Sequence, residues 1–134
     1  MNKLNRRGFI GFGTAFAVSG CGTWKGGAPA ITSTRNPNSL VRHLSIGCGN
    51  RAWGDVNEIR THPLVEMAAF CDVDSNYLAQ AKAKFPKARF YRDWREMFEK
   101  EFDSCDSVCV GAPDHHHVAM ATAALLAGKH VYLE

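Results

Sequence analysis

Two hydrophobic patterns alternate from residue 42 onward: short apolar runs, and longer segments with helical spacing. The apolar runs predict strands at residues 42–47, 65–71, 89–91, 107–111 and 130–133. The segments between them predict helices at residues 52–61, 77–85, 94–100 and 116–126. Because strands and helices alternate, we expect parallel strands joined by right-handed connections. The predicted fold is a doubly wound α/β sheet with strand order 3-2-1-4-5.

Residues that begin and end helices support these boundaries. Ser75 is placed to cap the second helix and Asp93 the third, because short polar side chains accept hydrogen bonds from free amides. Gly128 is expected to end the fourth helix, since glycine adopts left-handed dihedral angles without strain. Trp94 lies in an apolar stripe of the third helix, which favours a core position over contact with a ligand.

The turn after the first strand carries the glycine pattern Gly47-x-Gly49-x-x-Ala52. Gly47 permits a tight turn, Gly49 lets backbone approach a pyrophosphate, and Ala52 is small enough for the helix to pack on its strand. Asp72 ends the second strand 23 residues after Gly49, which suits an acid that binds the adenosine ribose. The pattern therefore predicts a dinucleotide site; the alternative is a glycine-rich turn with Asp72 as a solvated strand end.

Small residues and three histidines follow the fourth strand, where the strand order reverses. Gly111 and Ala112 leave room beside a nicotinamide ribose, and Pro113 directs the chain out of the sheet. Consecutive helical residues point about 100° apart, so residues 115–117 are not expected to converge on one metal ion. We expect His117 to face the ligand; the alternative is a capping or solvated histidine.

Composition narrows the function classes. The formal charge of +3 comes from Lys3, Arg6 and Arg7, and the rest of the chain has 13 basic and 13 acidic residues. This balance gives no electrostatic case for nucleic-acid binding. The five cysteines show no metal-ligand spacing and are expected to be small buried thiols rather than disulfides. A chain of 134 residues has room for one domain.

The N-terminal 40 residues are predicted to be an export signal followed by a flexible linker. Arg6 and Arg7 form a twin-arginine pattern before 13 small and apolar residues, too few to span a membrane. Residues 1–21 therefore predict an export signal, in which Cys21 is a candidate for lipidation, with ordinary cleavage as the alternative. Residues 22–40 are expected to form a flexible linker before the folded domain, residues 41–134. The expected location is periplasmic or membrane-anchored.

Four sequence motifs follow one another along the predicted folded domain. They are Ile46-Gly47-Cys48-Gly49-Asn50-Arg51-Ala52, Cys71-Asp72-Val73-Asp74, Ala112-Pro113-Asp114-His115-His116-His117 and Ala127-Gly128-Lys129-His130-Val131-Tyr132-Leu133-Glu134. In this order they resemble the glucose–fructose oxidoreductase and inositol dehydrogenase family (Gfo/Idh/MocA). The resemblance implies a Rossmann-type NAD-binding domain in a protein that moves a hydride between a sugar or polyol carbon and nicotinamide.

The resemblance also implies the site residues, all of them cofactor-binding, with no catalytic residue and no metal ligand in this chain. The implied pyrophosphate residues are Gly47, Cys48, Gly49, Asn50, Arg51 and Ala52. Asp72 would hold the adenosine ribose, with Val73 beside the adenine. The implied residues on the nicotinamide side are Ala112, Pro113, His117 and Glu134.

The family pattern continues after the position of Glu134 with a lysine that acts on the reacting hydroxyl, and then with a substrate domain. We therefore interpret the sequence as a fragment that is inactive alone, from a whole protein expected to be an oligomer. Asp72 would repel a 2′-phosphate, and no Arg or Lys stands in the nine residues after it. NAD is therefore favoured over NADP as the cofactor.

Three other functions stay open at this point. A glycosidase of the same family would oxidise a sugar, eliminate the aglycone and reduce the product with the same NAD. A non-catalytic dinucleotide-binding lipoprotein would keep only this half of the family pattern. A methyltransferase also uses a glycine loop and a strand-end acid, but it gives no reason for the segment from Gly128 to Glu134.

Overall fold

The structure, a computed structural model, describes residues 39–134. The elements are β1 (Val41–Ile46), α2 (Asn50–Ile59), β2 (Val65–Cys71), α3 (Ser75–Lys84), β3 (Arg89–Tyr91), α4 (Trp94–Glu101), the 3₁₀ turn η1 (Phe102–Ser104), β4 (Ser107–Val110), α5 (Asp114–Leu126) and β5 (His130–Leu133). The predicted export signal, Cys21 and the linker up to residue 38 lie outside the described residues.

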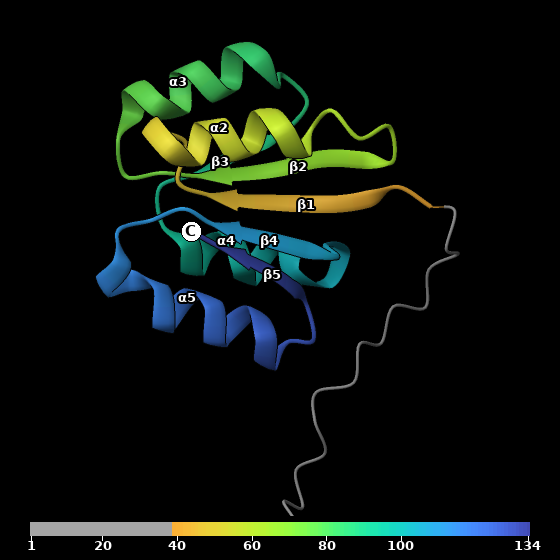
Figure 1. The fold of residues 1–134 in the computed structure, drawn as a ribbon, viewed down its shortest axis with the longest axis vertical. Coiled ribbons are helices and arrows are strands. Elements are labelled where there is room, and N and C mark those ends of the chain that lie inside the picture. The colour runs from red at the N-terminus through yellow and green to blue at the C-terminus, as the bar shows by residue number, and fades with distance from the viewer. Residues whose placement is uncertain (1–38) are drawn as a thin grey trace, which may run out of the picture.

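All five strands run parallel in the order β3-β2-β1-β4-β5, which confirms the predicted fold class. Figure 1 shows α2 and α3 together on one side of the sheet and α5 on the other. Sequence order reverses between β1 and β4, where the chain crosses from one half of the sheet to the other. In such sheets, ligands bind outside the carboxyl ends of the strands at this reversal.

The register places the carboxyl ends of the strands in one row. Ile46 of β1 pairs with Cys71 of β2 and with Val110 of β4. The same row continues outward to Tyr91 of β3 and Leu133 of β5. The residue that follows each strand therefore lies at a common edge, and these residues are Gly47, Asp72, Arg92, Gly111 and Glu134.

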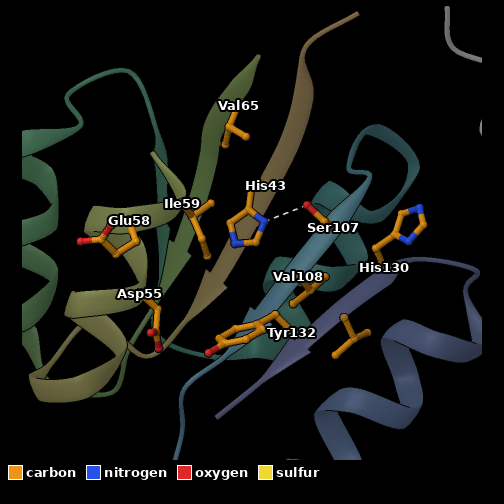
Figure 2. Close-up of a pocket in the computed structure, with 10 residues that line it drawn as sticks. His43, Asp55, Glu58, Ile59, Val65, Ser107, Val108, His130 and Tyr132 are labelled. Atoms are coloured by element: carbon orange, nitrogen blue, oxygen red, sulfur yellow. Dashed lines mark hydrogen bonds between the residues drawn. The ribbon is translucent and has the colours of Figure 1, made fainter. Parts of the chain in front are cut away.

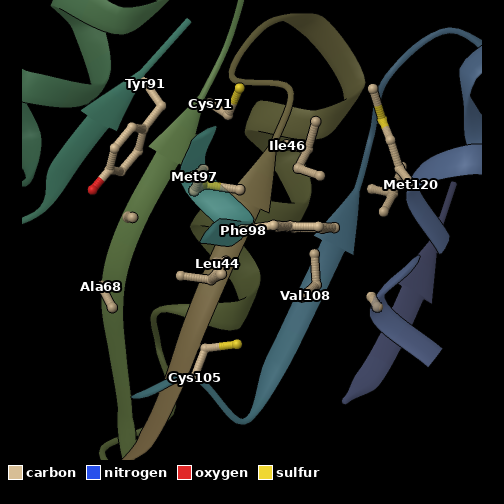
Figure 3. Close-up of a cluster of buried hydrophobic side chains, with 13 residues drawn as sticks. Leu44, Ile46, Ala68, Cys71, Tyr91, Met97, Phe98, Cys105, Val108 and Met120 are labelled. Carbon is tan, nitrogen blue, oxygen red and sulfur yellow. The ribbon is translucent and has the colours of Figure 1, made fainter. Parts of the chain in front are cut away.

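The sheet separates two apolar clusters. One lies against α4 and α5 and is shown in Figure 3, with Leu44, Phe98 and Val108 at its centre. The other lies under α2 and α3, where Phe70 is fully buried and its ring is 4.9 Å from that of Phe85. Apolar side chains cover both faces of β2, as is usual in a parallel sheet, whereas β1 carries two buried polar side chains, His43 and Ser45, on the face opposite Leu44.

The helix starts differ from the sequence prediction by up to two residues. Asp74, rather than Ser75, caps α3, because its carboxylate accepts a hydrogen bond from the Asn76 amide at 2.8 Å. Asp93 caps α4 as predicted, accepting from the Arg95 amide at 2.8 Å. Gly128 follows α5 with a φ of 72°, the left-handed conformation expected of a helix-ending glycine.

A buried carboxylate at the end of α4 joins this helix to β3. The Glu101 side chain is 1 % exposed and accepts hydrogen bonds from the Tyr91 hydroxyl, at 2.5 Å, and from the Arg89 guanidinium. Burial, followed by the hydrogen bond to Glu101, raises the pKa of Tyr91 to about 12. The tyrosine therefore remains a donor at physiological pH and keeps the buried carboxylate paired.

The four cysteines of residues 39–134 are free and buried, as predicted. Within the same residues, no helix combines the length and the apolar character needed to cross a membrane.

Candidate functional site

A cleft of about 780 Å³ opens at the carboxyl ends of the strands. Ten of the predicted cofactor residues line it: Gly47, Gly49, Asn50, Arg51, Ala52, Asp72, Val73, Ala112, Pro113 and Glu134. These residues come from the turn before α2, the end of β2, the loop before α5 and the end of β5. The topology therefore brings together segments that are more than 80 residues apart in the sequence.

The turn after β1 is built so that only glycine fits. Gly47 has a φ of 92°, and a Cβ added there would lie 2.5 Å from the carbonyl oxygen of Gly111. A Cβ at Gly111 would in turn lie 2.4 Å from the Cβ of Ala52. The small residues thus let the ends of β1 and β4 and the start of α2 meet. Ala52 must be small because it contacts Gly111 after β4, and not only because α2 packs on β1.

The start of α2 is left open. Gly49 occupies its N-cap position without a side-chain hydrogen bond, and the first turn of the helix contains no acidic residue. By contrast, an aspartate side chain caps the start of α3 and another caps the start of α4. Free amides at a helix start, together with the helix dipole, attract an anion. A Cβ at Gly49 would lie 2.5 Å from the Tyr77 ring, so the glycine also admits this ring to the cleft.

Asp72 is held in place by backbone amides on both oxygens. Its Oδ2 accepts from the Cys48 N–H at 2.7 Å, and its Oδ1 accepts from the Asp74 N–H at 2.9 Å. Each carboxylate oxygen has a second lone pair that is free to accept from a ligand hydroxyl. The acid therefore faces the cleft with a fixed orientation, as a ribose-binding carboxylate requires.

Cys48 belongs to the predicted pyrophosphate loop but does not line the cleft. Its side chain is fully buried, and its amide is already used by Asp72. Burial, followed by the charge of Asp72, raises the pKa of the Cys48 thiol above its usual range. Through this hydrogen bond Cys48 connects the turn after β1 to the end of β2.

Of the three neighbouring histidines, His116 lines the cleft, whereas His117, which was expected to face the ligand, does not. The Nε2 of His117 is 2.5 Å from the carbonyl oxygen of Ala112, so this histidine closes the turn before α5. This contact corresponds to the alternative of a capping histidine, and α5 begins at Asp114, two residues before the predicted start. Among residues 39–134, no group of three His, Cys, Asp or Glu side chains is arranged to hold a metal ion.

Glu134 connects the end of β5 to the start of α2. Its carboxylate accepts from the Tyr132 hydroxyl at 2.6 Å and pairs with Arg51 Nε at 2.5 Å. These two contacts, that from Tyr132 first, lower the pKa of the Glu134 carboxyl. The pair forms one wall of the cleft, beside Ala112 and Pro113 of the loop before α5.

Several lining residues were not predicted from the sequence. Tyr77 of α3, together with Arg92, Trp94 and Arg95 at the turn from β3 into α4, borders the end of the cleft near Asp72. Trp94 is half-buried. It packs against the core, as its place in an apolar stripe predicts, and it also lines the cleft. The turn after β3 could have been included in the predicted site, because the predicted strand order puts the third strand beside the second, which ends at Asp72.

A second cavity, of about 390 Å³, lies over β1, β4 and β5 and shares no lining residue with the cleft. Figure 2 shows His43 directed into it, with Nδ1 2.7 Å from the Ser107 hydroxyl. His43 Nε2 has no hydrogen-bond partner among the described residues. Burial lowers the pKa of His43 from 6.5 to about 4. None of the predicted cofactor residues lines this cavity, so the cleft is the candidate cofactor site.

The depressed pKa of His43 predicts a loss of stability in acid. The unfolded chain takes up this proton near pH 6.5 and the folded chain near pH 4, so the unfolded state binds more protons between these values. The full contribution is present above pH 6.5, and about 3 kcal/mol is lost as the pH falls to 4. Urea unfolding of His43→Asn should show a flatter pH dependence, while His115→Asn, at an exposed histidine, should match the unmutated chain. An NMR titration that puts the imidazole pKa of His43 above 6 would contradict this account.

The fold and the cleft together define a class of protein, a dinucleotide-binding domain of the Rossmann type. Residues 41–134 match the model of the Gfo/Idh/MocA family, described as an oxidoreductase family with an NAD-binding Rossmann fold. The chain belongs to this family, and residues 41–134 are its NAD-binding domain.

Individual relatives agree with this assignment. A glycosyl hydrolase family 109 protein of Solibacter usitatus is 30% identical over 146 residues, which cover 100% of this chain and 33% of the relative. The structure of myo-inositol 2-dehydrogenase from Lactobacillus plantarum has a TM-score of 0.65 at 26% identity, covering 71% of this chain and 28% of that one. A 3-ketoreductase from Actinomadura kijaniata, solved with TDP-benzene and NADP, has a TM-score of 0.61 at 25% identity, covering 71% and 30%. The chain thus spans a third or less of the length of these relatives.

Proposed function

We propose that residues 41–134 are the cofactor half of an oxidoreductase that moves a hydride between a sugar or polyol carbon and nicotinamide. The observation that carries the proposal is the row of strand ends, which combines an open helix start at Gly49, a fixed carboxylate at Asp72 and the wall formed by Arg51 and Glu134. The names of the relatives, a myo-inositol 2-dehydrogenase and a 3-ketoreductase, support a substrate with hydroxyl or keto groups on a ring.

The residues would divide the cofactor between them. The amides at the start of α2 would hold the pyrophosphate, Asp72 would accept from the adenosine ribose, and Ala112 and Pro113, which also line the cleft, would leave space for the nicotinamide. The cofactor, when bound, supplies the hydride chemistry. This domain would supply the orientation of the cofactor.

A glycosidase with a retained cofactor is the second candidate, favoured by the glycosyl hydrolase family 109 name of the 30% identical relative. The whole protein should be assayed with a polyol panel and with nitrophenyl glycosides, following absorbance at 340 nm and nitrophenol release. A dehydrogenase forms NADH in proportion to the substrate oxidised. A glycosidase of this type releases nitrophenol with no net NADH. If neither signal exceeds that of a heat-treated control, the catalytic proposal is wrong.

Export by the twin-arginine route, with Cys21 as a possible lipid anchor, is part of the same proposal and rests on residues 1–21 alone. Replacing Arg6 and Arg7 by lysine should keep the protein in the cytoplasmic fraction of the producing bacterium. An unchanged distribution between cell fractions would contradict export by this route.

A further inference from the structure

The end of β3 lies directly beside the ribose-binding end of β2. Cys71 pairs with Tyr91 in the parallel register, and the Asp72 amide donates to the Tyr91 carbonyl at 3.2 Å. Arg92 follows Tyr91, so it stands at the same edge of the sheet as Asp72, although 20 residues separate the two in sequence. No Arg or Lys stands in the nine residues after Asp72, but the pairing of β2 with β3 brings Arg92 to the same edge of the sheet.

Arg92 is oriented at this edge by one backbone contact. Its Nη2 donates to the Val73 carbonyl oxygen at 3.0 Å, and both residues line the cleft together with Asp72. A guanidinium carries five N–H donors, so this contact leaves most of them available. The side chain is otherwise exposed, and it can therefore accommodate a ligand without rearrangement of the core.

The charge of Arg92 is not neutralised by a neighbouring acid. Of the three arginines that line the cleft, Arg51 pairs with Glu134, and Arg95 with Asp93 at 3.5 Å. No described carboxylate lies within ion-pair distance of Arg92. Meanwhile both oxygens of Asp72 accept backbone N–H groups, which stabilise and partly offset its negative charge.

We propose that Arg92 is a specificity-determining residue of the dinucleotide site, and that it gives the cleft affinity for NADP as well as NAD. This inference rests on the proposed function. The ribose hydroxyls of NAD would donate to Asp72, whereas the 2′-phosphate of NADP would accept from the planar guanidinium of Arg92, which matches phosphate geometry. The cleft therefore carries a carboxylate for the ribose hydroxyls of NAD and a guanidinium for the 2′-phosphate of NADP.

The test compares the binding of NADH and NADPH to the 134-residue chain by fluorescence titration. The unmutated chain should bind both. Arg92→Gln should weaken NADPH binding at least tenfold and NADH binding less than threefold. Lys87→Gln removes the same charge from an exposed residue that does not line the cleft, and it should leave both affinities unchanged.

The outcomes separate this inference from the proposed function. If Arg92→Gln weakens NADH binding and NADPH binding equally, Arg92 only stabilises the loop around the site, and its proposed role in specificity is overturned. Binding of NADH without NADPH by the unmutated chain would also overturn it, and would leave the proposed function standing. If the unmutated chain, with a native circular dichroism spectrum, binds neither dinucleotide, the proposed function fails and this inference with it.

Discussion

Gly47→Ala should destabilise the domain by about 3 kcal/mol and abolish tight dinucleotide binding. The φ of 92° is unfavourable for any residue with a Cβ, and the new methyl would lie 2.5 Å from the Gly111 carbonyl oxygen. Because that oxygen is backbone, relief requires the ends of β1 and β4 to move apart. This movement changes the shape of the loop that faces the pyrophosphate. Urea unfolding and NADH titration measure the two effects.

Gly54→Ala is the matched control for this substitution. Gly54 lies inside α2, and a Cβ added there meets nothing within 4 Å. Alanine favours a helix interior over glycine by roughly 1 kcal/mol, so this variant should be slightly more stable and bind NADH normally. If both alanine variants unfold at the same urea concentration, the steric account of the β1 turn is wrong.

Asp72→Ala should weaken NADH binding by about 10- to 100-fold and destabilise the domain by roughly 2 kcal/mol. Binding weakens because the ribose hydroxyls lose a charged acceptor, whose hydrogen bonds contribute about 1.5–3 kcal/mol. Stability falls because the amides of Cys48 and Asp74 lose their partner. Fluorescence titration and denaturant unfolding separate these two losses.

Asp106→Ala supplies the comparison for Asp72. Asp106 also accepts from a backbone amide, that of Arg42 at 2.8 Å, but it precedes β4, at the other end of the strands from the cleft. Its removal should lower stability and leave NADH affinity within threefold of the unmutated chain. Comparable losses of affinity in both variants would mean that the effect of Asp72 is general destabilisation rather than ligand contact.

The sequence predicted the sheet and most of the cleft because their signals are local. The apolar runs defined β2, β3 and β5 to the residue, and the glycine pattern located the turn at Gly47. Asp72 was predicted from its place at the end of a strand, and Glu134 from the family resemblance; each directly follows a strand, and the register aligns them at one edge.

The prediction and the structure differ where geometry depends on a neighbouring element. His117 was expected to face the ligand, but its ring contacts the Ala112 carbonyl oxygen, and His116 lines the cleft. The hydrogen bond from the Cys48 amide to Asp72 joins residues 24 apart in sequence, and no local pattern reveals it. Glu101 follows Met97 by one helical turn, so its burial could have been predicted from the stripe.

The central claim is that the cleft at the strand ends binds a nicotinamide dinucleotide. The most direct measurement is an NMR titration of the ¹⁵N-labelled chain with NADH, following every backbone amide. The account predicts saturable one-site binding, with the largest shifts at Gly49, Asn50, Arg51 and Asp72. Absence of saturable binding by the folded chain, or shifts confined to the His43 cavity, would contradict it.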